Sequence, residues 1–591
     1  MLGGLVGDAL ARVPLTSAME DLAEICRHDR YQASHGINAA ARFVAERARE
    51  AGLADVWIHQ FPADGARHWW TFRAPVSWTP TQAILRIVRQ NEPRLIVDHE
   101  REPFALATYS APSLSAGTAC PLVNIVDAER RGLSGAIVLI GRDCAQPLDR
   151  LVSFITERGA CGFATDGPAR RVDDREFRGR VELRPDCRVF GFSLTSDEMR
   201  RARAAAEEGA HGEALVQIDR AALMPVVTGV VPGAPGQREV WLTSHLCHPR
   251  PGANDNASGS AALLALARMM RAPHAPSATV RFVWGPEYLG VAALLHEREC
   301  RSATLPQAVV NLDMVAEDQA RCGSPFVIER APDTVLSLIN PLAERIVQEV
   351  FEATSAQAGR WEASAFMGFS DHALFADPRL GVPAVQLCHV PDRFNHSAAD
   401  TFDKVCAEEL RRSVAAAFTL VSVLADERLQ ATLPLQDVVR AWCAREIQRA
   451  RECDAGDRVA ARGLLEYTVA RNERLLALVE PGHRPGPWPP ECLRAVASDE
   501  QRIASRWSGP LNLRELLDHS SAEARARAYA LVRRNKDNLA LLFSFAILAD
   551  GRRTRSQILQ ETAYARRWQL EPDVAATLMN ALEDSTWVHA L

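Results

Sequence analysis

Four apolar segments between residues 229 and 425 each run directly into polar or titratable residues. They are VWLTSHL, ATVRFVWG, QAVVNLDMV and VPAVQLCHV, and helical patterns separate them. This alternation predicts an α/β fold with an open sheet between layers of helices. Ligands of such sheets bind at the carboxyl ends of the strands, so we expect the chemistry at these polar strand ends.

The chain is long enough for several domains, because 591 residues exceed what one hydrophobic core usually holds. Residues 1–75, with helical patterns and the strand DVWIHQF, form the first part of the α/β domain. Residues 76–228 contain short strands and form an insertion, and residues 229–428 form the main part of the α/β domain. Residues 429–591 are mostly helical, and their final order of helix, turn, helix, helix and WVHAL is compatible with a winged helix.

Charge and hydropathy argue against nucleic acids and membranes as partners. The net charge is −6, and residues 431–591 hold 23 Lys and Arg against 21 Asp and Glu. A nucleic-acid surface would be clearly basic, so we expect no nucleic-acid partner and favour packing or homo-oligomer formation for the C-terminal region. No apolar run approaches about 18 residues, which predicts no membrane association. Thirteen cysteines without a pairing pattern favour reduced thiols and a cytoplasmic location.

Five titratable residues follow the predicted strands in order: His245, Asp255, Glu287, Asp313 and His396. Taken singly, each is as readily a helix cap or a hydrogen-bonded polar residue. Together, two imidazoles and three carboxylates suit one or two zinc ions, and two are favoured. A carboxylate shared by two metals can hold them about 3.5–4 Å apart.

These motifs resemble the dizinc aminopeptidases, a family that includes bacterial leucyl aminopeptidases and glutamate carboxypeptidase. GANDNASG is similar to the family loop whose acid bridges the metals, which implies that role for Asp255. NLDMV and HSAADT imply ligands at Asp313 and His396, and GFSDHALF implies that Asp371 and His372 lie near the pocket. The resemblance implies a mixed sheet sandwiched by helices, and residues around LSGAIVLIGRD resemble an inserted protease-associated domain.

The first ligand motif departs from the family pattern, which is H-x-D. This chain has His245-Leu246-Cys247, followed by His248. The run CHP resembles a bacterial branch of aminopeptidase-like proteins. His245 is the predicted ligand, while His248 and Cys247 are alternative ligands or neighbours of the metal site.

The second departure concerns two adjacent glutamates of the family, a general base and a metal ligand. Pro286-Glu287-Tyr288 stands here instead, so Glu287 is either the ligand or the catalytic base. If it is a ligand, another group must move the proton, and the candidates are Tyr288, Glu317, Asp318 and His372.

The resemblance implies a zinc-dependent hydrolase that removes an N-terminal amino acid or an aminoacyl group from a peptide or small molecule. Tyr288, Arg393 and Asn395 are candidates for contacts with the substrate. Two alternatives stay open: a single-zinc acyltransferase like the glutaminyl cyclases, and a catalytically weakened binding or regulatory protein on the same fold.

Overall fold

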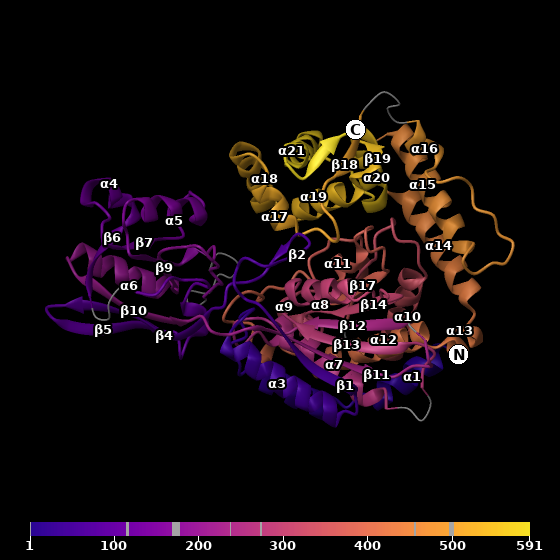
Figure 1. Ribbon diagram of the computed structural model, residues 1–591, viewed down its shortest axis with the longest axis horizontal. Coiled ribbons are helices and arrows are strands. Elements are labelled where there is room, and N and C mark those ends of the chain that lie inside the picture. The colour runs from indigo at the N-terminus through magenta and orange to yellow at the C-terminus, as the bar shows by residue number, and fades with distance from the viewer. Residues whose placement is uncertain are drawn as a thin grey trace.

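The computed structural model describes residues 2–113, 118–167, 178–236, 238–271, 275–357, 359–453, 457–495 and 501–591. Figure 1 shows three parts, which we call the core domain, the insertion and the C-terminal region. The insertion projects to one side of the core domain, and the C-terminal region lies along another edge of it.

The core domain is built on an eight-stranded sheet in the order β1-β11-β13-β12-β14-β17-β15-β16. Its strands are β1 Ala54–Phe61, β11 Met224–Val231, β12 Glu239–His245, β13 Thr279–Gly285, β14 Ala308–Leu312, β15 Phe326–Glu329, β16 Trp361–Ser364 and β17 Ala384–His389. Strands β13, β12, β14 and β17 run parallel. The pairs β1–β11, β11–β13 and β15–β17 are antiparallel, and β16 runs parallel to β15. The sheet is therefore mixed, as predicted.

Helices cover both faces of this sheet, because the apolar side chains of its strands point alternately to the two sides. In β12, Val240 and Leu242 enter one apolar cluster and Trp241 enters another. The first cluster is packed by α1 Leu2–Arg12, α2 Leu15–Ile25, α3 His35–Glu50, α7 Gly259–Met269, α10 Ile339–Ala353 and α12 Ala407–Ala425. The second is packed by α8 Leu289–Cys300 and α11 His372–Ala376. The predicted α/β sandwich is confirmed.

The insertion has its own seven-stranded sheet, in the order β5-β4-β10-β6-β7-β8-β9, and its own apolar core. Its elements are β4 Thr79–Arg89, β5 Glu92–Asp98, β6 Ala119–Asn124, α4 Ala128–Arg131, β7 Ile137–Ile140, α5 Leu148–Glu157, β8 Gly162–Thr165, β9 Phe190–Ser193, α6 Ser196–Glu207 and β10 His211–Asp219. The next strand, β11, crosses the expected boundary at residue 228. Residues 224–228 thus belong to the core sheet, because MPVVTGVV is one apolar strand paired with β1.

The C-terminal region combines helices with a three-stranded sheet in the order β19-β18-β20. Its elements are α13 Glu427–Thr432, α14 Leu435–Glu452, α15 Arg458–Leu476, α16 Glu491–Arg494, β18 Arg502–Ser505, α17 Leu513–Asp518, α18 Ala522–Arg534, α19 Asp537–Leu548, β19 Asp550–Thr554, α20 Arg555–Arg566, α21 Pro572–Glu583 and β20 Val588–Ala590. The expected boundary after residue 428 falls inside α13. From α19 to β20 the order is helix, strand, helix, helix and strand, and β19 stands where the sequence predicted a turn.

Short elements occupy the loops of the core domain and the insertion. Strands β2 His68–Trp69 and β3 Phe72–Arg73 pair as a hairpin between the two parts. Short helical turns occur at several loops: η1 Pro103–Ala105, η2 Ile125–Asp127, η4 Ala253–Ser258, α9 Gln319–Cys322 and η5 Phe402–Lys404. Across the described segments, no helix has the length and apolar character needed to cross a membrane. All thirteen cysteines are free thiols.

Candidate metal centre

The carboxyl ends of the parallel strands deliver the predicted residues to one edge of the core sheet. His245 is the last residue of β12, Asp313 directly follows β14, and Glu287 comes two residues after β13. Asp255 lies in the helical turn η4, and His396 lies in the loop after β17. The ends of parallel strands meet at one edge, which explains why residues far apart in sequence converge there.

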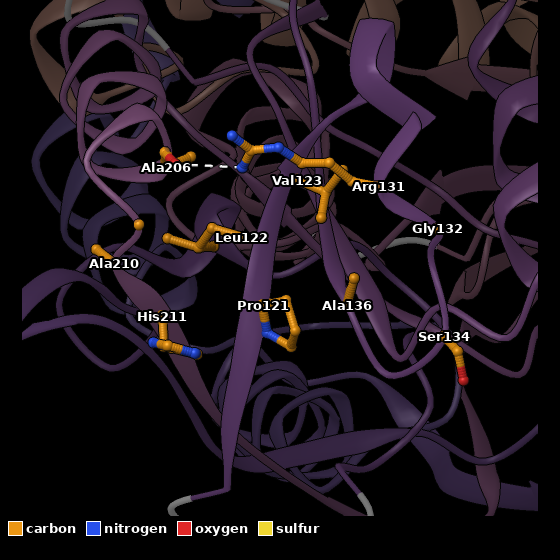
Figure 2. Close-up of a pocket in the computed structure, with 11 residues that line it drawn as sticks. Pro121, Leu122, Val123, Arg131, Gly132, Ser134, Ala136, Ala206, Ala210 and His211 are labelled. Atoms are coloured by element: carbon orange, nitrogen blue, oxygen red, sulfur yellow. Dashed lines mark hydrogen bonds between the residues drawn. The ribbon is translucent and has the colours of Figure 1, made fainter. Parts of the chain in front are cut away.

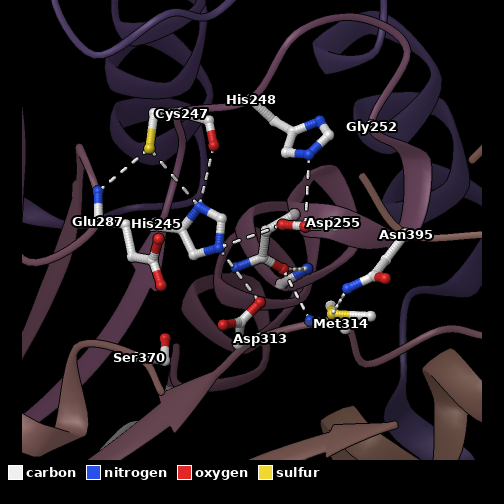
Figure 3. A network of polar contacts seen from close by, with 12 residues as sticks. His245, Cys247, His248, Gly252, Asp255, Glu287, Asp313, Met314, Ser370 and Asn395 are labelled. Carbon is white, nitrogen blue, oxygen red and sulfur yellow. Dashed lines mark hydrogen bonds and ion pairs between the residues drawn. The ribbon is translucent and has the colours of Figure 1, made fainter. Parts of the chain in front are cut away.

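Two clusters of candidate ligands share the carboxylate of Asp255 (Figure 3). In the first cluster, His245 Nε2 lies 3.4 Å from Asp255 Oδ1 and 3.2 Å from Asp313 Oδ1. In the second, Asp255 Oδ2 lies 3.3 Å from His248 Nε2 and 3.2 Å from His396 Nε2. Each carboxylate oxygen of Asp255 thus faces a different cluster. His248, an alternative in the sequence, belongs to the second one.

Main-chain carbonyls fix the orientation of two of these imidazoles. Nδ1 of His245 lies 3.0 Å from the carbonyl oxygen of Cys247, and Nδ1 of His248 lies 2.8 Å from that of Pro249. A carbonyl only accepts, so each Nδ1 carries a proton, and each Nε2, on the side of Asp255, is the nitrogen that can bind a metal ion. The Cys247 carbonyl therefore orients the His245 ring, as the outer partners of metal-binding imidazoles do.

The donor set fits zinc. Imidazole nitrogens and carboxylate oxygens are the ligands that zinc prefers beside thiolates. His248 Nε2 is buried and makes no hydrogen bond, although a carboxylate oxygen lies 3.3 Å away. Such an orphaned nitrogen is what two ligands of one ion would leave when the ion is absent. His396 is 43% exposed, so the second cluster lies on the more open side of the centre.

Burial and neighbouring charges shift the pKa values of two carboxyl groups of the centre, those of Asp255 and Glu287. Burial favours the neutral form of Asp255, yet His248, His245 and His396 hold the pKa of this carboxyl well below its ordinary range. Burial raises the pKa of Glu287 to about 8; His245 opposes this effect, and the neighbouring Asp313 adds to it.

Glu287 lies beside these clusters but belongs to neither of them. Its main-chain N–H donates to Cys247 Sγ at 3.1 Å, so the thiol holds the glutamate backbone. Cys247 is likewise outside both clusters. The next residue, Tyr288, has a left-handed backbone (φ 57°), and its N–H donates to Asp371 Oδ1 at 2.5 Å.

The other residues predicted to lie near the pocket have structural partners. His372 Nε2 contacts Glu329 Oε1 at 2.7 Å, and Asn395 Nδ2 approaches Met314 Sδ at 3.9 Å. Arg393 is exposed and lies over the ring of Phe394.

The two acidic candidates for proton transfer also have other roles. Glu317 accepts from Asn254 Nδ2 at 3.0 Å, and Asp318 caps α9.

Sequence reasoning missed Asp400, which holds the loop that carries the shared carboxylate. Its side chain accepts the main-chain N–H groups of Asn254 at 2.8 Å and Asp255 at 2.9 Å. It is buried, and burial raises its pKa to about 8. Its position four residues after His396 was the only signal in the sequence.

The insertion also contacts the ligand loop. The main-chain N–H of Arg180 donates to the carbonyl of His396 at 2.8 Å, and Ala398 N–H donates to the carbonyl of Arg178 at 2.9 Å. Gly179 and Ser397 form a β-bridge between these two bonds. Residues 178–180 therefore fix the backbone of a candidate ligand.

A separate cavity of about 380 Å³ lies in the insertion (Figure 2). Pro121 and Val123 of β6 line it together with Ser134 and His211. Arg131 reaches across it toward the carbonyl of Ala206, at 3.5 Å. It contains none of the candidate ligands.

Arg30 is a second residue without a sequence signal. Its buried guanidinium donates to the carbonyls of Leu246 at 2.8 Å, Ile25 at 2.6 Å and Gly252 at 3.2 Å. It thus joins α2 to both ends of the loop that carries His248.

We expect Arg30→Met to lower the free energy of unfolding by about 3 kcal/mol or more. At least two buried carbonyls would lose their donor, at about 1–3 kcal/mol each. Urea unfolding would measure the change, with the 76% exposed Arg27, substituted in the same way, as the control. Equal unfolding midpoints for the two variants would contradict this role.

Comparison with known proteins agrees with this geometry. Residues 226–421 match the model of peptidase family M28. No curated protein sequence matches the chain. Among solved structures, a putative peptidase from Clostridium acetobutylicum has 12% identity and a TM-score of 0.51, covering 99% of this chain and 98% of its own.

Two further structures are similar over 70% or more of this chain. The zinc aminopeptidase BSAP from Bacillus subtilis has 15% identity and a TM-score of 0.51, covering 70% of this chain and 96% of its own. A peptidase M28 precursor from Shewanella amazonensis has 17% identity and a TM-score of 0.50, covering 72% and 96%. At these identities the likeness concerns the fold. The predicted resemblance to the zinc aminopeptidase family is confirmed by the match of residues 226–421 to the model of peptidase family M28.

Proposed function

We propose that this protein is a zinc-dependent aminopeptidase with two metal ions. The observation that carries the proposal is the shared carboxylate of Asp255, which faces one ligand cluster with each of its oxygens. His245 and Asp313 would complete one zinc site, and His248 and His396 the other. Zinc ions bound there would polarise the scissile carbonyl and activate the attacking water.

Glu287 is the proposed general base. With His248 available for the second cluster, Glu287 is not needed as a ligand, and it lies on the side of the first cluster, near His245 and Asp313. Its carboxylate would take a proton from the attacking water and return it to the leaving amine. The Cys247 thiol and Asp371 hold the backbone on either side of it, at Glu287 N and Tyr288 N.

The alternatives are less well supported. A glutaminyl-cyclase-like acyltransferase needs one zinc site, and the second cluster would then have no purpose. A binding protein without catalysis would not require the Glu287 carboxylate beside a complete ligand set. The proposed substrate is a peptide or an aminoacyl small molecule with a free amino terminus.

Hydrolysis of aminoacyl-p-nitroanilides would test this function, with the N-acetylated form of each substrate as the matched control. We expect turnover of the free-amine substrates, loss of it after chelation, and recovery when zinc is restored. Turnover of the acetylated substrates alone would exclude aminopeptidase action. Cyclisation of glutaminyl peptides without hydrolysis would favour the acyltransferase, and bound zinc without either reaction would favour a binding protein.

A further inference from the structure

A second cavity lies between the core domain and the C-terminal region, apart from the metal clusters. Its volume is about 60 Å³. The core domain contributes residues 330–334 and 365–366, and the C-terminal region contributes side chains of α15, α19 and α20. By volume it would hold roughly four to six water molecules. That space also suits one carboxylate or phosphate group.

Buried donors without partners surround this cavity. They are Thr334 Oγ1, Arg471 Nε, Thr562 Oγ1 and Arg566 Nη1. Arg566 is 6% exposed, Arg471 8% and Thr562 1%. Buried polar groups in folded proteins nearly always have a partner, so four such atoms around one cavity indicate a missing acceptor.

Arg566 lacks a counter-ion. Its Nε donates to Ser544 Oγ at 3.3 Å and its Nη2 to the carbonyl of Phe366 at 2.7 Å, and both acceptors are neutral. Within the described parts of the chain, no carboxylate forms an ion pair with it. Burial lowers its pKa to about 10, and the more distant carboxylates of Glu329 and Asp537 oppose this effect only in part. Leaving a buried cation unpaired is costly, whereas an anion in the cavity would neutralise it.

The acidic residues of the cavity are already occupied. Asp333 accepts from Tyr467 and from Arg471 Nη1, at 3.2 Å each. Glu561 accepts two hydrogen bonds from Arg553. These carboxylates therefore do not compete for the free Nη1 of Arg566.

We propose that this cavity is a binding site for a small oxyanion, a carboxylate or phosphate group, held by Arg566 with help from Thr562 and Arg471. The shared chemistry is a set of acceptor oxygens that matches guanidinium and hydroxyl donors.

The site adjoins the catalytic edge of the core domain. Arg566 holds the carbonyl of Phe366, whose ring packs on Phe543 at 5.7 Å. Two residues on, the carbonyl of Gly368 accepts from the Tyr288 hydroxyl at 2.9 Å. The anion would thus bind next to Phe366, at one end of a loop segment whose other end, Gly368, contacts Tyr288, the residue after Glu287.

Calorimetric titration of the zinc-loaded protein would test the proposal, with sodium phosphate and sodium acetate as probes and sodium chloride at equal ionic strength as reference. We expect phosphate, acetate or both to bind with Kd of about 1 mM or below. Arg566→Gln should weaken binding at least about ten-fold, the loss expected from one charge-assisted contact. Thr562→Val, which changes only an unpartnered hydroxyl, should weaken it without unfolding the protein.

Two control variants show whether the anion binds in this cavity. Arg552→Gln removes an exposed arginine of the same region and should leave binding unchanged. Asp255→Asn, compared with the wild-type protein after chelation of its zinc, should also leave binding unchanged, because phosphate held at the metal centre would depend on that residue. Binding of only one probe would identify the group as phosphate or carboxylate. Failure of both probes to exceed chloride at about 10 mM, equal binding by Arg566→Gln, or loss of binding in Asp255→Asn would overturn the proposal.

Discussion

Asp255→Asn is expected to remove both zinc ions and to abolish turnover. Its two carboxylate oxygens face different ligand clusters, so a neutral amide would weaken both sites at once. Zinc measured by atomic emission should fall from about two per chain to near zero, because one bridging charge serves both ions. Aminoacyl-p-nitroanilide hydrolysis should fall to the background rate.

Two companion variants sharpen this result. His248→Ala affects only the second cluster, so it should retain about one zinc per chain. Asp8→Asn, an exposed aspartate on α1, should retain both ions. A wild-type protein with one zinc, or an Asp255→Asn protein with undiminished zinc, would contradict the shared-carboxylate centre.

Glu287→Gln is expected to lower kcat by about 10²–10⁴-fold while zinc content stays at the wild-type level. The amide keeps the size of the side chain but cannot take a proton from the attacking water. Steady-state kinetics and metal analysis on the same preparation would separate the two roles that the sequence left open. Loss of one zinc would make Glu287 a ligand.

The control for this variant is Glu362→Gln, which changes an exposed glutamate of β16. Its kcat and zinc content should match the wild type. If Glu287→Gln also retained full activity, the proton would have to move through another group, and Glu287 would be neither base nor ligand.

Strand periodicity predicted the core of the fold, and the polar residues at its strand ends, together with the resemblance of GANDNASG, NLDMV and HSAADT, predicted four residues of the candidate centre. His245, Asp255, Asp313 and His396 all follow buried strands or motif loops, and parallel pairing brings such positions together. The boundary of the insertion was harder to predict, because the apolar run of β11 looks the same in either sheet. Pairing with β1 decides its place, and pairing is not local.

The ligand role of His248 could not be decided from sequence, because it depends on ring orientation. A single carbonyl, that of Pro249, turns its Nε2 toward Asp255. Asp400 and Arg30 act on loops about 145 and 220 residues away, through main-chain groups that carry no sequence signature. Such contacts follow from tertiary packing alone.

The β-bridge between residues 178–180 and 396–398 has a consequence for engineering. The backbone of His396 is fixed by the insertion, not by the core domain alone. The insertion therefore cannot be exchanged independently of the metal centre. A chimaera with another insertion would have to retain residues 178–180 to keep the zinc affinity of the core domain.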